Sequence, residues 1–73
     1  MTKLPQIKPK MLVGFFIKQG FLVTRQVGSH VRLVHKDGRR ITLAAHNKPI
    51  APGTFHSILK QAGMSRETFL ELF

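Results

Sequence analysis

The chain contains no cysteine, no tryptophan and no tyrosine, and only three of its 73 residues are acidic. The lack of cysteine excludes disulfide bonds, thiolate nucleophiles and cysteine-ligated metal centres, and it fits a reducing, cytoplasmic location. Without Trp or Tyr, the chain has no obvious platform on which nucleic-acid bases would stack. The scarcity of carboxylates argues against a metal-dependent nuclease, which needs several carboxylates converging on its metal ions.

Long hydrophobic runs are also missing, since a membrane-spanning helix needs about twenty consecutive apolar residues. The longest run extends only from Met11 to Ile17 and is followed directly by strand-like patterns. We therefore expect a core helix here, and neither a membrane anchor nor a signal peptide.

Positive charge is present in excess, because twelve Lys and Arg residues give a formal net charge of +9. Hydrophobic residues make up 42% of the chain, which is too many for a disordered basic tail. A small basic domain of this kind suits a polyanionic partner, and we expect that partner to be nucleic acid. We predict one folded domain over residues 8–73, preceded by a flexible arm over residues 1–7.

Three segments have the features of helices. The first is expected over residues 9–19, because Pro9 suits a first turn and Gly20 a helix end. Thr54 is expected to cap a second helix over residues 55–62, and Ser65 a short third one.

Three segments between the first two helices alternate between apolar and polar residues, as strands do. They are predicted over residues 21–27, 30–35 and 40–44, joined by turns at Gly28-Ser29 and Asp37-Gly38. A meander of these strands with helices on one face is an α+β fold whose other sheet face stays open.

The same alternation assigns side chains to the two faces of the sheet. In strand 30–35, Val31 and Leu33 point to the core, so His30 and Arg32 point outward. Arg25 interrupts the apolar side of the first strand. We expect the open face to carry Thr24, Gln26, His30, Arg32 and Thr42.

A polar, basic sheet face is suited to metal-free cleavage of RNA, in which the substrate's own 2′-hydroxyl is the nucleophile. The protein then supplies a base with a pKa near 7 and cations for the phosphate, and His30 and Arg32 meet that need. The alternative is that His30 is an ordinary strand residue. The four histidines lack the short spacings of a metal site, and we expect none.

Other basic residues have two interpretations each. Lys36, Arg39 and Arg40 around the second turn either grip phosphates or keep the hairpin tip soluble. His46 after the third strand is either a second acid or phosphate donor or a plain loop residue. His56, which lies early in the second helix near Lys60, is either a phosphate contact or a solvated helix residue.

The order of motifs resembles the HicA family of small toxins. The resemblance rests on Gly28-Ser29-His30, Asp37-Gly38-Arg39-Arg40, His46, and Gly53-Thr54 leading into a segment from Ser57 to Gly63. It implies a fold like the double-stranded-RNA-binding domain and a ribonuclease that acts on messenger RNA as the toxin of a type II toxin–antitoxin system. It also implies a HicB-like antitoxin that covers the active histidine.

Carried over by motif, the family's catalytic histidine corresponds to His30. Two other functions stay open on the residues alone: a non-catalytic double-stranded-RNA-binding module, and a protein whose basic face only docks an acidic partner. The expected RNA contacts around His30 are Gly28, Ser29, Arg32, Lys36, Arg39, Arg40, Thr42, His46 and Lys60.

Overall fold

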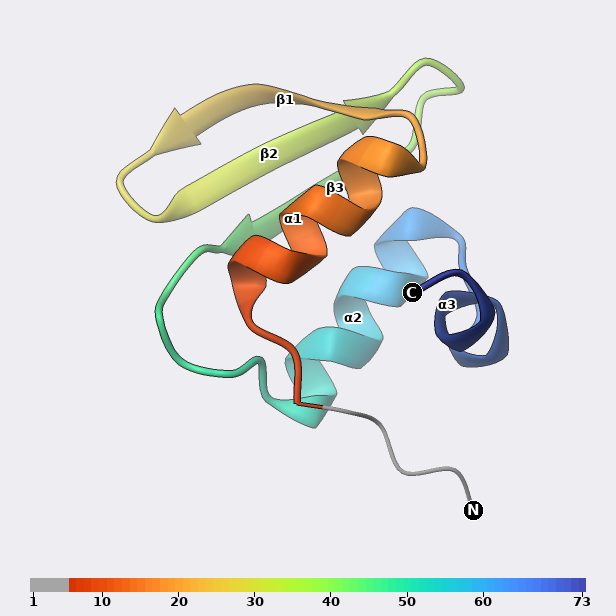
Figure 1. Ribbon diagram of the computed structural model, residues 1–73. Coiled ribbons are helices and arrows are strands. Elements are labelled where there is room, and N and C mark those ends of the chain that lie inside the picture. The colour runs from red at the N-terminus through yellow and green to blue at the C-terminus, as the bar shows by residue number, and fades with distance from the viewer. Residues whose placement is uncertain (1–5) are drawn as a thin grey trace.

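The computed structural model describes residues 6–73, in the order α1, β1, β2, β3, α2, α3. The strands form one antiparallel sheet in sequence order, with α1 packed against β1 and α2 against β3 (Figure 1). The predicted α+β architecture, similar to a double-stranded-RNA-binding domain, is confirmed. The elements are α1 Pro9–Lys18, β1 Phe21–Val27, β2 His30–His35, β3 Arg40–Ala44, α2 Pro52–Ala62 and α3 Arg66–Leu72.

The strand bounds are those predicted from the sequence, and each of the two hairpin turns contains a glycine of positive φ. Gly28, with φ 60°, opens the two-residue turn between β1 and β2. Gly38, with φ 99°, lies in the turn between β2 and β3, where the Gly38 amide donates to the carbonyl of His35 over 2.9 Å.

The second helix starts three residues earlier than predicted. Ala51 is its N-cap and Pro52 its first residue, a position where the missing amide hydrogen of proline costs no hydrogen bond. Thr54 therefore lies inside the helix and does not cap it. The predicted end is correct, since Gly63 has φ 65° and the amides of Gly63 and Met64 donate to the last turn.

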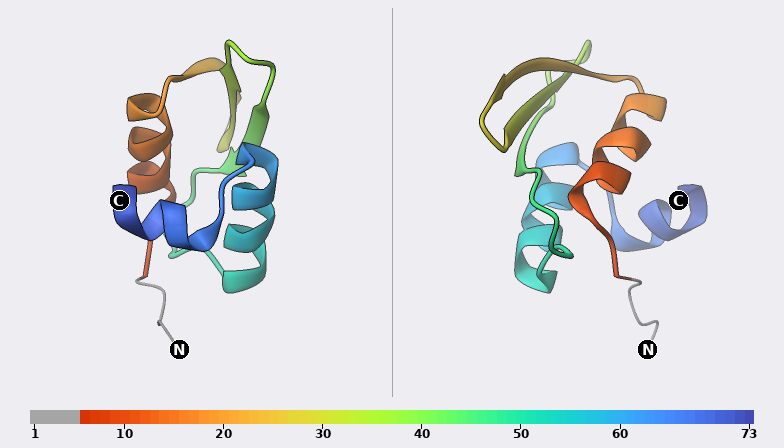
Figure 2. Two further views of the ribbon diagram at one scale, coloured as in Figure 1. Left: turned by 90° about the vertical axis from the view of Figure 1, so that its right-hand side faces the viewer. Right: turned by 60° about the vertical axis from the view of Figure 1, so that its left-hand side comes forward.

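The third helix is capped as predicted, by the Ser65 hydroxyl, which accepts from the amide of Thr68 over 3.1 Å. Its Phe69 is fully buried, with ring centroids 4.7 Å from Phe15 and 5.0 Å from Phe55. Phe73 stacks on Phe69 but remains half exposed. This helix lies across α1 and α2 (Figure 2).

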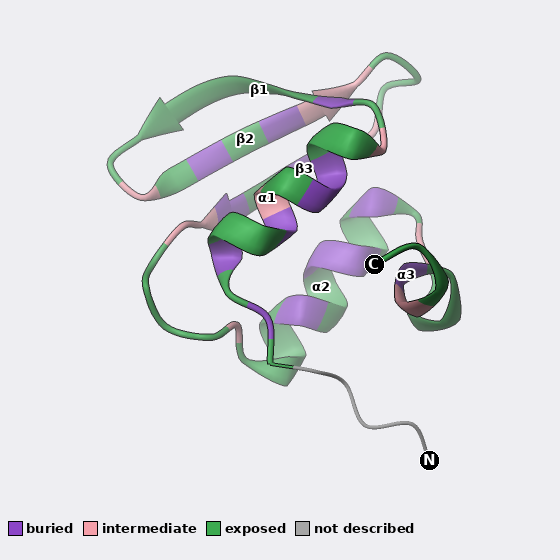
Figure 3. Ribbon diagram, in the orientation of Figure 1, coloured by how far each residue is buried: buried purple, intermediate pink, exposed green. Residues whose placement is uncertain are grey.

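The core lies between the helices and the inner face of the sheet (Figure 3). Ile7 belongs to it: its side chain is 3% exposed, and its carbonyl accepts from the amide of Ile50 over 2.8 Å. The folded part therefore includes one residue that we assigned to the arm, and residues 1–5 of that arm lie outside the described residues. The buried sheet residues are Phe21, Val31, Leu33, Ile41 and Leu43.

The two edges of the sheet differ. At the β3 edge, the amide of Thr42 donates to the Gln61 side chain of α2 over 3.0 Å. The β1 edge is mostly exposed, and its Gly28-Ser29 end projects beyond the helices (Figures 1 and 3). The projecting end is where the candidate site lies.

Candidate functional site

The strand register arranges the outer face of the sheet, which points away from the helices, in rows across the three strands. Residues directly opposite each other in an antiparallel ladder share a face. Because His30 and Arg32 alternate with the buried Val31 and Leu33, each of them marks a row of the outer face. The rows are Val27, His30 and Ala44; then Arg25, Arg32 and Thr42; then Leu22, Val34 and Arg40.

The first two rows surround a shallow depression of about 120 Å³. His30, Arg32, Thr42 and Arg25 are all exposed around it. The depression therefore brings one imidazole, two guanidinium groups and one hydroxyl to the same open surface. Its lining is Arg25, Val27, His30, Val31, Arg32 and Thr42.

Of the residues predicted on this face, Gln26 is not there, and Thr24 lies in an irregular part of the strand. The register shifts between Val23 and Arg25, which leaves Thr24 as the extra residue of a β-bulge. After the bulge, Gln26 is paired with Val31 and so lies on the inner side of the strand. Arg25 and Val27, which the sequence analysis put on the inner side, lie on the outer face.

The sequence does contain the signal for this correction. A two-residue turn at Gly28-Ser29 pairs Val27 directly with His30, and counting back from that pair sets Arg25 opposite Arg32. Alternation that starts at Phe21 predicts the opposite faces for residues 25–27, because the bulge lies between Phe21 and the turn. Arg25 is thus the site residue that the sequence analysis missed.

The tight turn before His30 fixes the position of this residue at the start of β2. Only the first of the two turn residues has a positive φ, as in a type II′ turn, and glycine suits that position. The carbonyl of Ser29 accepts from the amide of Ala45 over 2.6 Å, which extends the pairing of β2 with β3 past His30. Gly28 and Ser29 therefore position the backbone of His30.

The second hairpin turn holds a different arrangement around Arg39. Its Nε donates to Asp37 Oδ2 over 2.8 Å and its Nη1 to the carbonyl of Ala62 over 2.6 Å. The guanidinium also lies 5.2 Å from the ring centroid of Phe21. Because these contacts tie the turn to α2 and to the core, we leave Arg39 out of the candidate RNA surface.

Asp37 is the carboxylate of this turn. A hydrogen bond from the backbone amide of Arg39, together with the Arg39 guanidinium, lowers the pKa of Asp37 below its ordinary value. Lys36 is exposed beside it at the tip. Since the turn lies at the opposite end of β2 from His30, Lys36 is not part of the depression.

Arg40 lies on the outer face, one row beyond Arg32, and is exposed. His46 and Lys60 do not line the depression. His46 lines a separate hollow together with Pro9 of α1 and Ile58 of α2.

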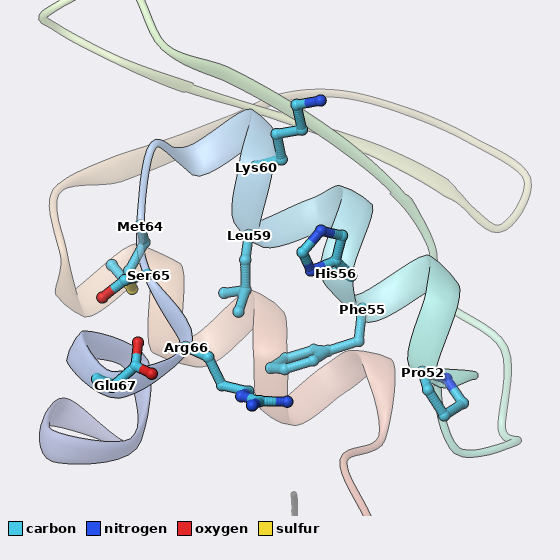
Figure 4. Close-up of a pocket in the computed structure, with 9 residues that line it drawn as sticks. All are labelled: Pro52, Phe55, His56, Leu59, Lys60, Met64, Ser65, Arg66 and Glu67. Carbon is cyan, nitrogen blue, oxygen red and sulfur yellow. The ribbon is translucent and has the colours of Figure 1, made fainter.

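Lys60 and His56 project from α2 around a groove of about 530 Å³ between α2 and α3, with Phe55 and Leu59 pointing into it (Figure 4). This groove lies on the helical side of the molecule. The structure thus brings together Gly28, Ser29, His30, Arg32 and Thr42, and leaves Lys36, Arg39, His46 and Lys60 elsewhere.

A family model described as the HicA toxin of bacterial toxin–antitoxin systems matches residues 9–64, which include all three strands and the depression. The chain belongs to the HicA family. Membership makes it a toxin of a toxin–antitoxin system. No curated protein matches the sequence.

Residues 6–73 of this HicA protein contain neither a membrane-spanning helix nor a cluster of metal ligands. No helix there is long and apolar enough to cross a membrane. Groups of three or more His, Asp or Glu side chains that could hold a metal ion are also not found within that range.

Proposed function

We propose that this HicA protein is an endoribonuclease that cleaves messenger RNA, with His30 as the general base. The observation that carries the proposal is the position of His30, exposed on an open basic face directly beside the row that contains Arg32. A histidine accepts a proton near neutral pH, and guanidinium groups stabilise charge on phosphate.

The reaction uses the 2′-hydroxyl of the RNA as the nucleophile. His30 accepts the 2′-hydroxyl proton as the 2′-oxygen bonds to the adjacent phosphorus, and the bond from phosphorus to the 5′-oxygen breaks. The departing oxygen takes up a proton, so the products have a 2′,3′-cyclic phosphate and a 5′-hydroxyl. Arg32 stabilises the negative charge that develops on the phosphate oxygens.

The proposal includes a HicB-like antitoxin that covers His30 in the cytoplasm until the toxin is released. Family membership supports an antitoxin partner. The charge supports its chemistry, because a partner for the outer face must meet three arginines and no carboxylate among the residues of its rows.

The test is incubation of the purified chain and of its His30→Ala variant with cellular RNA in EDTA. We expect fragments with cyclic phosphate ends from the parent chain only. An oligonucleotide with 2′-deoxyribose at every position should resist cleavage, since it lacks the nucleophile. Cleavage by both proteins would show that His30 is not the base, and cleavage abolished by EDTA would refute the metal-free reaction.

One observation favours a non-catalytic RNA-binding module as a second candidate. None of the residues in the rows of the outer face, apart from His30, is an obvious acid or base near pH 7. Such a module would bind RNA with steep salt dependence and yield no fragments. Intact RNA that remains bound to the parent chain in EDTA would favour this candidate.

A further inference from the structure

We propose that Arg25, positioned by the bulge at Thr24, forms with Arg32 a two-guanidinium site that binds the scissile phosphate beside His30. The inference rests on the proposed function and adds a residue to it.

The first step is the pairing itself. Arg25 and Arg32 are directly opposite each other on the outer face, between β1 and β2. The Cβ atoms of such a pair are about 4.5–5.5 Å apart, and like charges at that distance destabilise a sheet. The arginine–carboxylate ion pair found in residues 6–73 joins Arg39 and Asp37 at the other hairpin turn, so it neutralises neither Arg25 nor Arg32. An anion bound between the two guanidinium groups would relieve their repulsion.

The second step is the size and lining of the hollow. The depression measures about 120 Å³, and it is lined by both arginines together with His30 and Thr42. Pockets that hold a small molecule start at about 300 Å³. The depression is therefore large enough for a phosphate group but too small to enclose a base. Its lining residues can donate hydrogen bonds to phosphate oxygens.

The third step explains why the strand needs a bulge. Phe21 is fully buried against Phe16, with ring centroids 5.4 Å apart, so the start of β1 must point that side chain inward. In an unbroken strand, Arg25 would share the side of Phe21. The extra residue Thr24 changes the alternation, so the same strand buries Phe21 and presents Arg25 to the outer face.

The experiment compares three proteins with the parent chain. Arg25→Gln removes the guanidinium. The exchange Arg25→Gln with Gln26→Arg keeps the composition and net charge but moves the guanidinium to the inner side of β1. Arg66→Gln, in α3 on the helical side, makes the same charge change outside the depression.

Cleavage is measured with purified RNA in EDTA, and RNA affinity is measured in chains that also carry His30→Ala. We expect Arg25→Gln and the exchange each to lower the cleavage rate by about 10- to 100-fold. Each should also reduce the slope of log affinity against log salt by about 0.7, the value for one lost phosphate contact on a single strand. Arg66→Gln should leave both near the parent values.

Full activity in the exchange variant would overturn the proposal, because it would show that only total charge matters. An equal loss in Arg66→Gln would overturn it for the same reason. If the parent chain fails to cleave RNA, the proposed function fails, and the salt slopes still decide whether Arg25 contacts a phosphate. An unchanged slope in Arg25→Gln would then refute the site itself.

Discussion

At the scale of single residues, two glycines predict opposite effects of the same substitution. Gly20 has φ 99°, and a Cβ there would lie 2.9 Å from His35 Nε2. Gly14 is inside α1, and a Cβ there would have no neighbour within 4 Å. We expect Gly20→Ala to destabilise the fold by about 1–3 kcal/mol, and Gly14→Ala to stabilise it by about 0.5–1 kcal/mol. Chemical denaturation of both variants measures the difference, and equal effects would contradict it.

Asp37 predicts a pH dependence whose sign follows from its lowered pKa. A carboxyl whose pKa is lower in the folded than in the unfolded state stabilises the fold above its unfolded pKa. That contribution is lost as the pH falls through the folded pKa, below the ordinary value of 3.8. We expect Asp37→Asn to lower the melting temperature at about pH 6, and the difference from the parent to vanish at about pH 2. A difference that persists at the acid end would contradict the assignment.

The sequence predicts His30 and Arg32 on the outer face but not Arg25, because the position of Arg25 depends on how two strands pair. Placing His30 and Arg32 on the outer face required only their alternation with Val31 and Leu33, which is a local property of one strand. Placing Arg25 required the pairing of two strands and the position of a bulge. The contacts of Arg39 with Ala62 join parts of the chain that are 23 residues apart, and no local pattern predicts them.

At the scale of elements, the strands were predictable because a glycine lies just before β1 and in each hairpin turn, where only glycine readily adopts a positive φ. The start of α2 was predicted less well. We predicted the hydroxyl of Thr54 as the cap and Pro52 as part of the loop, whereas Pro52 is the first residue of the helix, a position that suits proline. The buried side of α2 was nevertheless correct, because its spacing is a property of any helix: Phe55, Ile58, Leu59 and Ala62.

The family model ends at residue 64, before α3. We expect the stability of the domain to depend on α3 as well. Phe69 is fully buried between the other two helices. We expect Phe69→Ala to cost about 3–5 kcal/mol of stability, and Ser65→Ala about 0.5–2 kcal/mol through loss of the cap. Leu72→Ala, at a side chain that is 52% exposed, is the control and should cost much less. Equal losses from Phe69→Ala and Leu72→Ala in urea denaturation would show that α3 is not packed as described.

At the scale of the whole molecule, the charged residues in the rows of the outer sheet face are all arginines, whereas the helices carry both positive and negative side chains. The outer face has Arg25, Arg32 and Arg40 without a carboxylate in its rows, whereas α3 contains both Glu67 and Glu71. RNA and the proposed antitoxin both need the region around His30. They should therefore compete for one surface, and a single charge reversal on it should weaken both complexes.

Arg32→Glu tests that competition. It places a carboxylate next to Arg25, and it should repel both the phosphates of RNA and the carboxylates that we expect on the antitoxin. We expect the dissociation constant of each complex to rise by about tenfold or more, measured by titration at fixed ionic strength in chains that carry His30→Ala. Arg66→Glu makes the same change in charge on the helical side and should leave the antitoxin complex intact. If Arg32→Glu weakens RNA binding but not antitoxin binding, the antitoxin docks away from the outer face, and inhibition must work without covering His30.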